Sequence, residues 1–343
     1  MRRIILIISL GIILLTNTYS QSNDKLTFQD FPIENISIRA IEIANDSTLW
    51  FAGSDGKYGR IINNKIKIES LENKDLHFRS IAFNGKNIFI LSIENPAVLY
   101  KIDSNSDAPE PIEAYRETNE KVFYDSMQFF DEKNGIAMGD PTEDCLSVIT
   151  TQDGGNSWKK ISCNNLPKVY DGEAAFAASN TNIAICKNNV WLVSGGKKSR
   201  IFYSPDKGKN WKAFNTPIVQ GKTMTGIFTV DFYDEKNGII MGGNWEEKDN
   251  FKNTKAITKD GGKTWNLISN GKEPGYISCV QYVPDSKGTE IFAVSTEGIY
   301  QSENSGVTWR KISTKRYYTI RFVDKNTAWL AGKDIITRIK IEE

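Results

Sequence analysis

An eight-residue motif, Ser/Thr-x-Asp-x-Gly-x-x-Trp, recurs along this chain and constrains its fold more than any other feature. Three copies match fully and a fourth has Asn in place of Asp; they occupy residues 151–158, 204–211, 258–265 and 302–309. The Asp carboxylate can accept backbone N–H bonds across a tight turn, the Gly can adopt a positive φ, and the Trp offers a large apolar face. Four copies cannot share one catalytic pocket, so the motif predicts a repeated scaffold turn.

A longer unit surrounds the motif. The segments 126–139 (SMQFFDEKNGIAMG), 229–242 (TVDFYDEKNGIIMG) and 320–332 (IRFVDKNTAWLAG) share a strand–turn–strand pattern, and four further segments follow it with altered turns. The resulting seven units of about 40–50 residues each read as four short strands, a to d, with the motif between c and d. The sequence therefore predicts an all-β chain that forms a single seven-bladed β-propeller of four-stranded blades.

The two ends of the repeat array complement each other. The last unit stops after its third strand, at residues 335–341 (IITRIKI), whereas residues 25–31 (KLTFQDF) form a spare strand before the first unit. We expect this N-terminal strand to complete the last blade and to close the ring. The propeller domain is expected to span residues 21–343.

Residues 1–20 are typical of a secretory signal peptide. Two arginines precede an apolar run from Ile4 to Leu15, which is too short to span a bilayer, and a short polar stretch follows. We expect cleavage near Gln21, a periplasmic or secreted location, and no membrane insertion after cleavage.

Composition excludes several classes of function. Lys and Arg number 43 and Asp and Glu 42, which gives no electrostatic basis for binding nucleic acid. His77 is the single histidine, which excludes a zinc site with several histidines and disfavours a Ser-His-Asp triad. We therefore expect no metal and no cofactor.

Four cysteines are compatible with export but do not require disulfides. Cys145 and Cys163 lie symmetrically about Gly154, so a hairpin centred there would place them nearly opposite each other. The sequence leaves open whether they are bridged. Cys186 and Cys279 lie in apolar runs and are expected to be buried thiols.

A functional site is expected on the face opposite the motif turns, where the d–a and b–c connections of a propeller open. Alignment of the units places these residues at the start of strand a, around the channel: Arg39, Arg79, Asp125, Glu173, Phe228, Ser278 and Tyr318. Tyr124 lies beside this ring, and Asp140 and Trp245 lie on b–c loops.

Six of these residues are the candidate ligand contacts: Arg39, Arg79, Tyr124, Asp140, Trp245 and Tyr318. Arginine pairs with carboxylates, and an exposed indole can stack on a sugar ring. Charged strand ends can also be solvated, with Arg and Asp neutralising each other. A ring without any ligand therefore stays an alternative.

The repeated motif resembles the Asp box of bacterial neuraminidase-repeat propellers. The DGGKTW form at 260–265, with seven units, most resembles the photosystem II stability/assembly factor-like family. This resemblance covers nearly all of the chain after residue 20 and implies a propeller that works as a binding or assembly module. Sialidases are more distant, because their Arg-Ile-Pro motif has no match at Arg39 or Arg79, and no catalytic residue is carried over from them.

Two functions follow from these observations. The first is an exported, monomeric binding or assembly propeller that holds an envelope protein or a saccharide on its strand-a and b–c face. The alternative is a glycoside-cleaving enzyme acting on an acidic saccharide, with Asp125 and Glu173 as its catalytic carboxylates. Such a pair needs carboxyl groups separated by roughly 5–9.5 Å.

Overall fold

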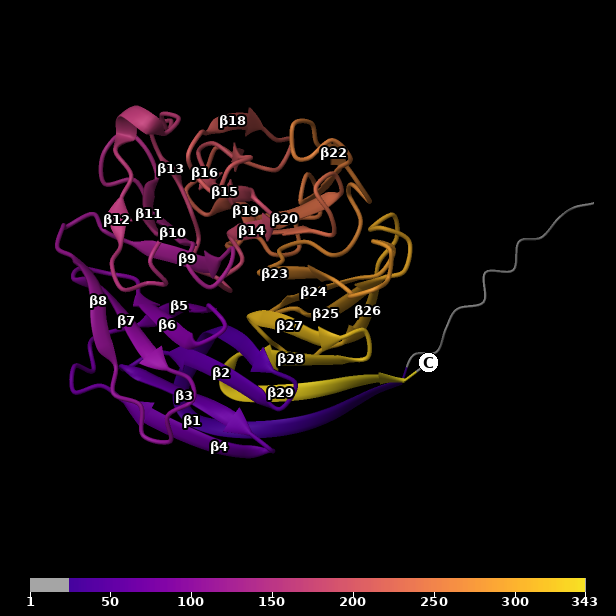
Figure 1. Ribbon diagram of the computed structural model, residues 1–343. Helices are drawn as coiled ribbons and strands as arrows, with labels where there is room; N and C mark the ends of the chain where they lie inside the picture. Colours follow the sequence, from indigo (N-terminus) through magenta and orange to yellow (C-terminus); the bar gives the residue numbers. More distant parts are fainter. Residues whose placement is uncertain (1–24, 343) are drawn as a thin grey trace, which may run out of the picture.

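The computed structural model describes residues 25–342, and these residues form antiparallel sheets arranged around a central axis (Figure 1). The single helical element in this range is the short 3-10 turn η1 (Cys163–Asn165). No helix among the described residues is long and apolar enough to span a membrane. The expected signal peptide, residues 1–20, lies outside the described residues.

Four of the sheets in residues 25–342 have four strands each, and the first strand of each lies nearest the centre (Figure 1). The first two sheets contain β5 (Phe78–Phe83), β6 (Asn87–Ser92), β7 (Ala97–Asp103) and β8 (Ile112–Glu117), then β9 (Tyr124–Phe129), β10 (Gly135–Gly139), β11 (Ser147–Thr151) and β12 (Lys159–Lys160). The other two contain β14 (Ile183–Cys186), β15 (Asn189–Val193), β17 (Arg200–Ser204) and β18 (Lys212–Asn215), then β23 (Cys279–Tyr282), β24 (Ile291–Ser295), β25 (Gly298–Ser302) and β26 (Arg310–Ser313).

Two larger sheets complete the circle. The six-stranded sheet joins β13 (Glu173–Ala174) and β16 (Gly195–Gly196) to β19 (Thr225–Phe232), β20 (Gly238–Asn244), β21 (Lys255–Thr258) and β22 (Asn266–Leu267). The seven-stranded sheet contains β27 (Thr319–Asp324), β28 (Thr327–Ala331), β29 (Lys333–Glu342), β1 (Lys25–Asn45), β2 (Thr48–Gly53), β3 (Lys57–Ile62) and β4 (Lys65–Ser70).

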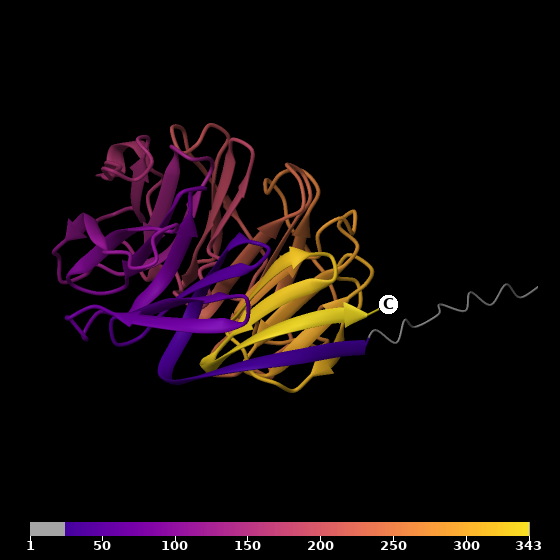
Figure 2. The same cartoon turned by 60° about the horizontal axis from the view of Figure 1, so that its bottom comes forward.

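The long strand β1 connects the two ends of the chain. Its first part, Lys25–Pro32, pairs with β29, and its second part, from Ile38 to Asn45, pairs with β2 (Figure 2). The register shifts between Pro32 and Ser37, where β1 passes from one partner to the other. The predicted closure by the N-terminal strand is therefore confirmed.

Apolar side chains pack between neighbouring sheets. The ring of Trp191 on β15 lies 3.6 Å from that of Phe232 on β19, and the indole donates a hydrogen bond to the carbonyl of Gly261. Phe89 on β6 packs in the same way against Phe129 on β9, at 4.7 Å. These contacts join each sheet to the next one around the axis.

The motif turns are held by bonds within each turn. The Thr151 hydroxyl donates to Asp153 Oδ1 at 2.8 Å and accepts from the Gly155 N–H at 2.9 Å. The same two bonds recur in the turns at 204–211 and 258–265. Burial raises the pKa of Asp153, but bonds from Ser157 and its neighbours outweigh it and hold the pKa at about 2.

Replacing Asp153 with Ala is expected to lower the free energy of unfolding by about 1 kcal/mol, because two backbone N–H groups lose their acceptor while water reaches this exposed turn. Urea unfolding near neutral pH measures the loss. Gln152→Ala is the control in the same turn and should leave the midpoint unchanged. Equal midpoints for both variants would show that the carboxylate does not stabilise the turn.

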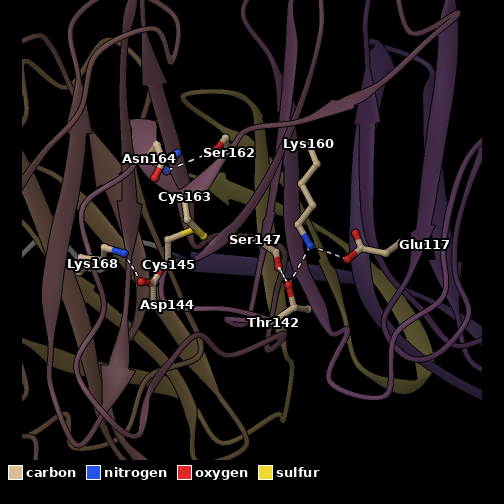
Figure 3. The surroundings of a disulfide bond; sticks show 10 residues. All are labelled: Glu117, Thr142, Asp144, Cys145, Ser147, Lys160, Ser162, Cys163, Asn164 and Lys168. Carbon is tan, nitrogen blue, oxygen red and sulfur yellow. Dashed lines mark hydrogen bonds and ion pairs between the residues drawn. A yellow bond between two sulfur atoms is a disulfide. The ribbon is translucent and has the colours of Figure 1, made fainter.

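Cys145 and Cys163 form a disulfide, with their Cα atoms 5.4 Å apart (Figure 3). The bridge ties the residues before β11 to the turn η1 after β12, as a hairpin centred on Gly154 allows. Cys186 is a half-buried free thiol and Cys279 is a buried one. The expected burial is therefore found for Cys279, whereas Cys186 is only half-buried.

The central segment, residues 175–182, differs from the expectation. The sequence alignment starts strand a of the fourth unit at Glu173, but the inner strand there is β14, which begins at Ile183. Asn180 donates from its side chain to the Ile81 carbonyl (2.7 Å) and accepts from the Met127 N–H (3.0 Å). The Arg321 guanidinium donates to the carbonyls of this segment. The segment therefore links inner strands of several sheets.

Candidate functional site

A β-bulge at the start of the inner strand positions four of the predicted ring residues. Arg39, Arg79, Asp125 and Phe228 each fall where the register of β1, β5, β9 and β19 shifts by one residue. A bulge leaves the extra residue out of the ladder and redirects its side chain. The equivalence seen in the sequence therefore has a backbone cause that was not predicted.

Glu173 does not belong to this ring. The Val193 N–H bonds the Asn182 carbonyl, and the corresponding residue of β2 pairs with Ala40, directly after Arg39. The equivalent ring position in that sheet is therefore Thr181, which is buried. Glu173 lies instead on β13, paired with Gly196 of β16. Sequence alignment of the units places Glu173 in the ring because it treats the segment after Glu173 as an inner strand.

The Glu173 carboxylate is held by hydrogen bonds from other residues of the chain. It accepts from Arg200 Nη2 at 2.6 Å, from the Ser194 hydroxyl at 2.5 Å and from the Tyr170 N–H at 2.9 Å. Both side chains of the Arg200–Glu173 pair are buried. A carboxylate held in this way stabilises the fold and is not free to attack or protonate a substrate.

Arg39, Arg79 and Tyr318 form a cationic mouth. The Arg39 guanidinium lies 4.0 Å from the centre of the Tyr318 ring and donates to the Ala178 carbonyl at 3.2 Å. Burial lowers the pKa of Arg79, and the nearby positive charge of Arg39 lowers it further. Both arginines are half-buried. Two adjacent guanidinium groups favour an anion between them.

The internal ion pairs of residues 25–342 involve neither Arg39 nor Arg79. The Nε atom of Arg39 is buried and has no hydrogen-bond partner among the described residues. The predicted neutralisation of the ring by Arg–Asp ion pairs is therefore not found in this part of the chain. The charges of Asp125 and Glu94 act on Arg79 without forming an ion pair with it.

Asp125 lies within the electrostatic reach of Arg79, yet it is fully buried. Neither of its carboxyl oxygens has a hydrogen-bond partner among the described residues. Burial raises its pKa well above the usual value, Asp140 raises it further, and Arg79 opposes the shift. Burial also raises the pKa of Asp140 to about 6, against a bond from the Ala175 N–H.

An aromatic cluster borders the mouth. Phe228 stacks on Phe176 at 3.9 Å between ring centres and meets the edge of Tyr276 at 4.8 Å. Burial raises the pKa of Tyr276, whereas the charge of Arg39 lowers it, which places Tyr276 beside the mouth. Phe176 is the half-buried, outer member of the stack.

The remaining candidates fall in different places. Trp245, directly after β20, is 47% exposed, and the Lys248 ammonium lies 5.4 Å from its ring centre. Tyr124 is fully buried, and its hydroxyl donates to Glu117 at 2.8 Å, so its prediction as a ligand contact is wrong. It precedes the bulge at Asp125 and therefore points into the core.

Asp140 and Glu173 also line an open cleft of about 490 Å³. Most of its other lining residues come from the loop after β10 and from residues 169–174. Although several are acidic, no group of three His, Cys, Asp or Glu side chains in the described part of the chain could hold a metal ion.

Comparisons with known proteins bear on the fold. The family model described as "Sortilin, neurotensin receptor 3" matches residues 146–297, less than half of the chain. No curated protein matches the sequence. Solved structures do match, as follows: YCF48 bound to D1 peptide (TM-score 0.65, 13% identity, 92% of this chain and 97% of the other) and YCF48 from Cyanidioschyzon merolae (0.62, 13%, 92% and 98%).

Virginiamycin B lyase from Staphylococcus aureus, in a catalytically inactive form with quinupristin, is similar as well (TM-score 0.62, 12% identity, 93% of this chain and 100% of the other). The chain is a β-propeller. At such identities the likeness shows the fold alone, because propellers carry unrelated functions. The predicted all-β propeller of four-stranded antiparallel sheets is confirmed.

Proposed function

We propose that this chain is an exported binding or assembly module that holds an anionic segment of an envelope protein at its cationic mouth. The observation that carries the proposal is the juxtaposition of Arg39 and Arg79, half-buried and without an internal ion pair in residues 25–342. Arginine donates in a planar fork that fits a carboxylate, and Tyr318 already fixes one of the two guanidinium groups.

The neighbouring surface supports a protein partner. Phe176 stacks on Phe228 near the start of β19, and the exposed indole of Trp245 follows Asn244, which pairs with the first residue of β19. Both therefore add apolar area at this end of β19. Interfaces combine such aromatic anchors with arginine. A propeller of similar fold has been solved with a D1 peptide bound, which supports peptide recognition by this architecture. An acidic saccharide is the other ligand that arginines and an indole would suit.

Export and the number of blades belong to the same proposal. The pattern of residues 1–20 supports a signal peptide, and the Cys145–Cys163 disulfide supports an oxidising compartment. Dividing β1 at the register shift between Pro32 and Ser37, and setting aside the two-residue strands β13 and β16, gives four strands to each unit. This count supports seven blades closed by the N-terminal strand. We expect the module to act as a monomer.

The glycoside-cleaving alternative is not proposed further. It requires Asp125 and Glu173 as a catalytic pair, whereas the Glu173 carboxylate is held by Arg200 and Ser194. Asp125 is affected by the charges of Asp140 and Arg79, and Glu173 is not among the charges that shift its pKa.

Site-specific photo-crosslinking tests which face binds. A photoreactive residue at Tyr318 reports on the mouth, and the same residue at Lys259, in a motif turn, is the matched control on the other face. In the native envelope we expect a discrete crosslinked partner from position 318 and none from position 259. The reverse pattern would place the binding surface on the motif turns and refute the proposal.

A further inference from the structure

Asp125 is the buried acidic neighbour of the cationic mouth. It occupies the bulge of β9, and Arg79 occupies the corresponding bulge of β5, a strand that packs against β9. Its carboxyl oxygens contact neither solvent nor any hydrogen-bond donor among residues 25–342. Such a carboxyl group is stable when protonated and costly when ionised, unless a nearby cation offsets the charge.

The charged groups that face Asp125 come from several elements. Arg79 lies on β5, and Asp140 directly follows β10. Beyond Arg79 lie Arg39 of β1, Glu94 after β6 and Tyr318 before β27. Of the other strands packed against β9, β6 contains no charged residue, and Asn182, directly before β14, carries no charge. Arg79 is therefore the cation that Asp125 and a bound anion would share.

We infer that Asp125 makes anion binding at the mouth depend on protonation, an inference that rests on the proposed function. With Asp125 protonated, the full charge of Arg39 and Arg79 attracts the ligand. An ionised Asp125 neutralises part of that charge and repels the anion. By linkage, a bound anion favours the protonated carboxyl to the same degree. Asp125 thus acts as a positioning residue, because its protonation state sets the pH range in which the mouth binds an anion.

Sulfate is a suitable probe, because its charge stays constant between about pH 5 and about pH 8 while carboxyl and imidazole groups titrate. Sulfate affinity of the mature chain is measured by calorimetry at constant ionic strength. We expect the wild type to bind sulfate about tenfold more weakly at the upper end of this range. Asp125→Asn should keep the tight binding seen at low pH and lose the pH dependence.

Two further variants separate Asp125 from its neighbours. Asp140→Asn removes a charge that raises the pKa of Asp125. The sulfate affinity of this variant should therefore begin to fall at a lower pH than that of the wild type. His77→Gln removes the single histidine and should behave like the wild type. Loss of the pH dependence in His77→Gln would overturn the assignment to Asp125.

The outcomes distinguish the inference from the proposed function. Sulfate binding that requires Arg39 and Arg79 but has the same pH dependence in Asp125→Asn refutes the inference and leaves the anion site intact. If sulfate does not bind at any pH, both fail. Should Asp125→Asn not fold, the carboxyl ¹³C shift of Asp125 in the wild type gives the answer. Its titration midpoint should rise when sulfate is added, and an unchanged midpoint refutes the inference.

Discussion

Arg200→Ala is expected to destabilise the chain by about 3–5 kcal/mol, because it leaves the Glu173 carboxylate buried without its cation. The remaining donors, Ser194 and the Tyr170 N–H, cannot compensate a full charge. Urea unfolding at neutral pH measures the loss. The pair fixes the short strand β13, which leads into the central segment whose Ala178 carbonyl accepts from Arg39.

Two control variants test whether the loss of stability comes from the buried charge of Glu173. Arg116→Ala breaks an ion pair with Glu113 in which both side chains are well exposed, and it should cost at most about 1 kcal/mol. Combining Arg200→Ala with Glu173→Gln removes the buried charge and should recover a large part of the loss. A loss below about 1 kcal/mol in Arg200→Ala would show that water or another cation reaches Glu173.

Replacing Arg39 and Arg79 together with Ala is expected to weaken partner binding by about 2–5 kcal/mol, which corresponds to roughly 30-fold to several thousand-fold in affinity. Both guanidinium groups are half-buried, so a bound anion would lose its two nearest cations in a partly desolvated place. The affinity of the crosslinked partner, once identified, is measured by calorimetry for wild type and variant.

The double variant needs a test of its fold and a matched change elsewhere. Arg39 stacks on Tyr318 and bonds the Ala178 carbonyl, so unfolding curves should accompany the binding data. Lys259→Ala combined with Lys263→Ala removes the same charge from a motif turn and should leave affinity unchanged. Equal weakening by both pairs would mean that net charge, and not the mouth, governs binding.

The repeat could be predicted from the sequence because its chemistry is local. Thr151, Asp153 and Gly155 satisfy one another within a single turn, so their spacing alone indicates the geometry. The closing role of residues 25–31 was also predictable, since the last unit lacked one strand. Arg39 and Arg79 were found at equivalent positions because the bulge that places them recurs in the same part of each unit.

The errors arose where a distant contact decides the structure. Alignment of the units assigns the central segment to an inner strand, but its Asn180 side chain bonds to Ile81 and Met127 from other sheets. As a result Glu173 lies outside the ring, and Thr181 occupies the equivalent position. Tyr124 was misplaced because neighbouring residues of a strand point to opposite sides. Tyr124 is buried in the core, whereas the next residue, Asp125, lies at the bulge. The partner of Glu173, Arg200, lies on another strand, and no sequence spacing indicates it.

Amide hydrogen exchange of the mature chain, with and without its crosslinked partner, tests the binding face most directly. Exchange should slow around Arg39 at the bulge within β1, around Arg79 at the bulge of β5 and around Tyr318 directly before β27. The motif turns at 151–158, 204–211, 258–265 and 302–309 should exchange at the same rate in both states. Protection of those turns, with none at the mouth, would contradict the assignment of this propeller's function to the cationic mouth.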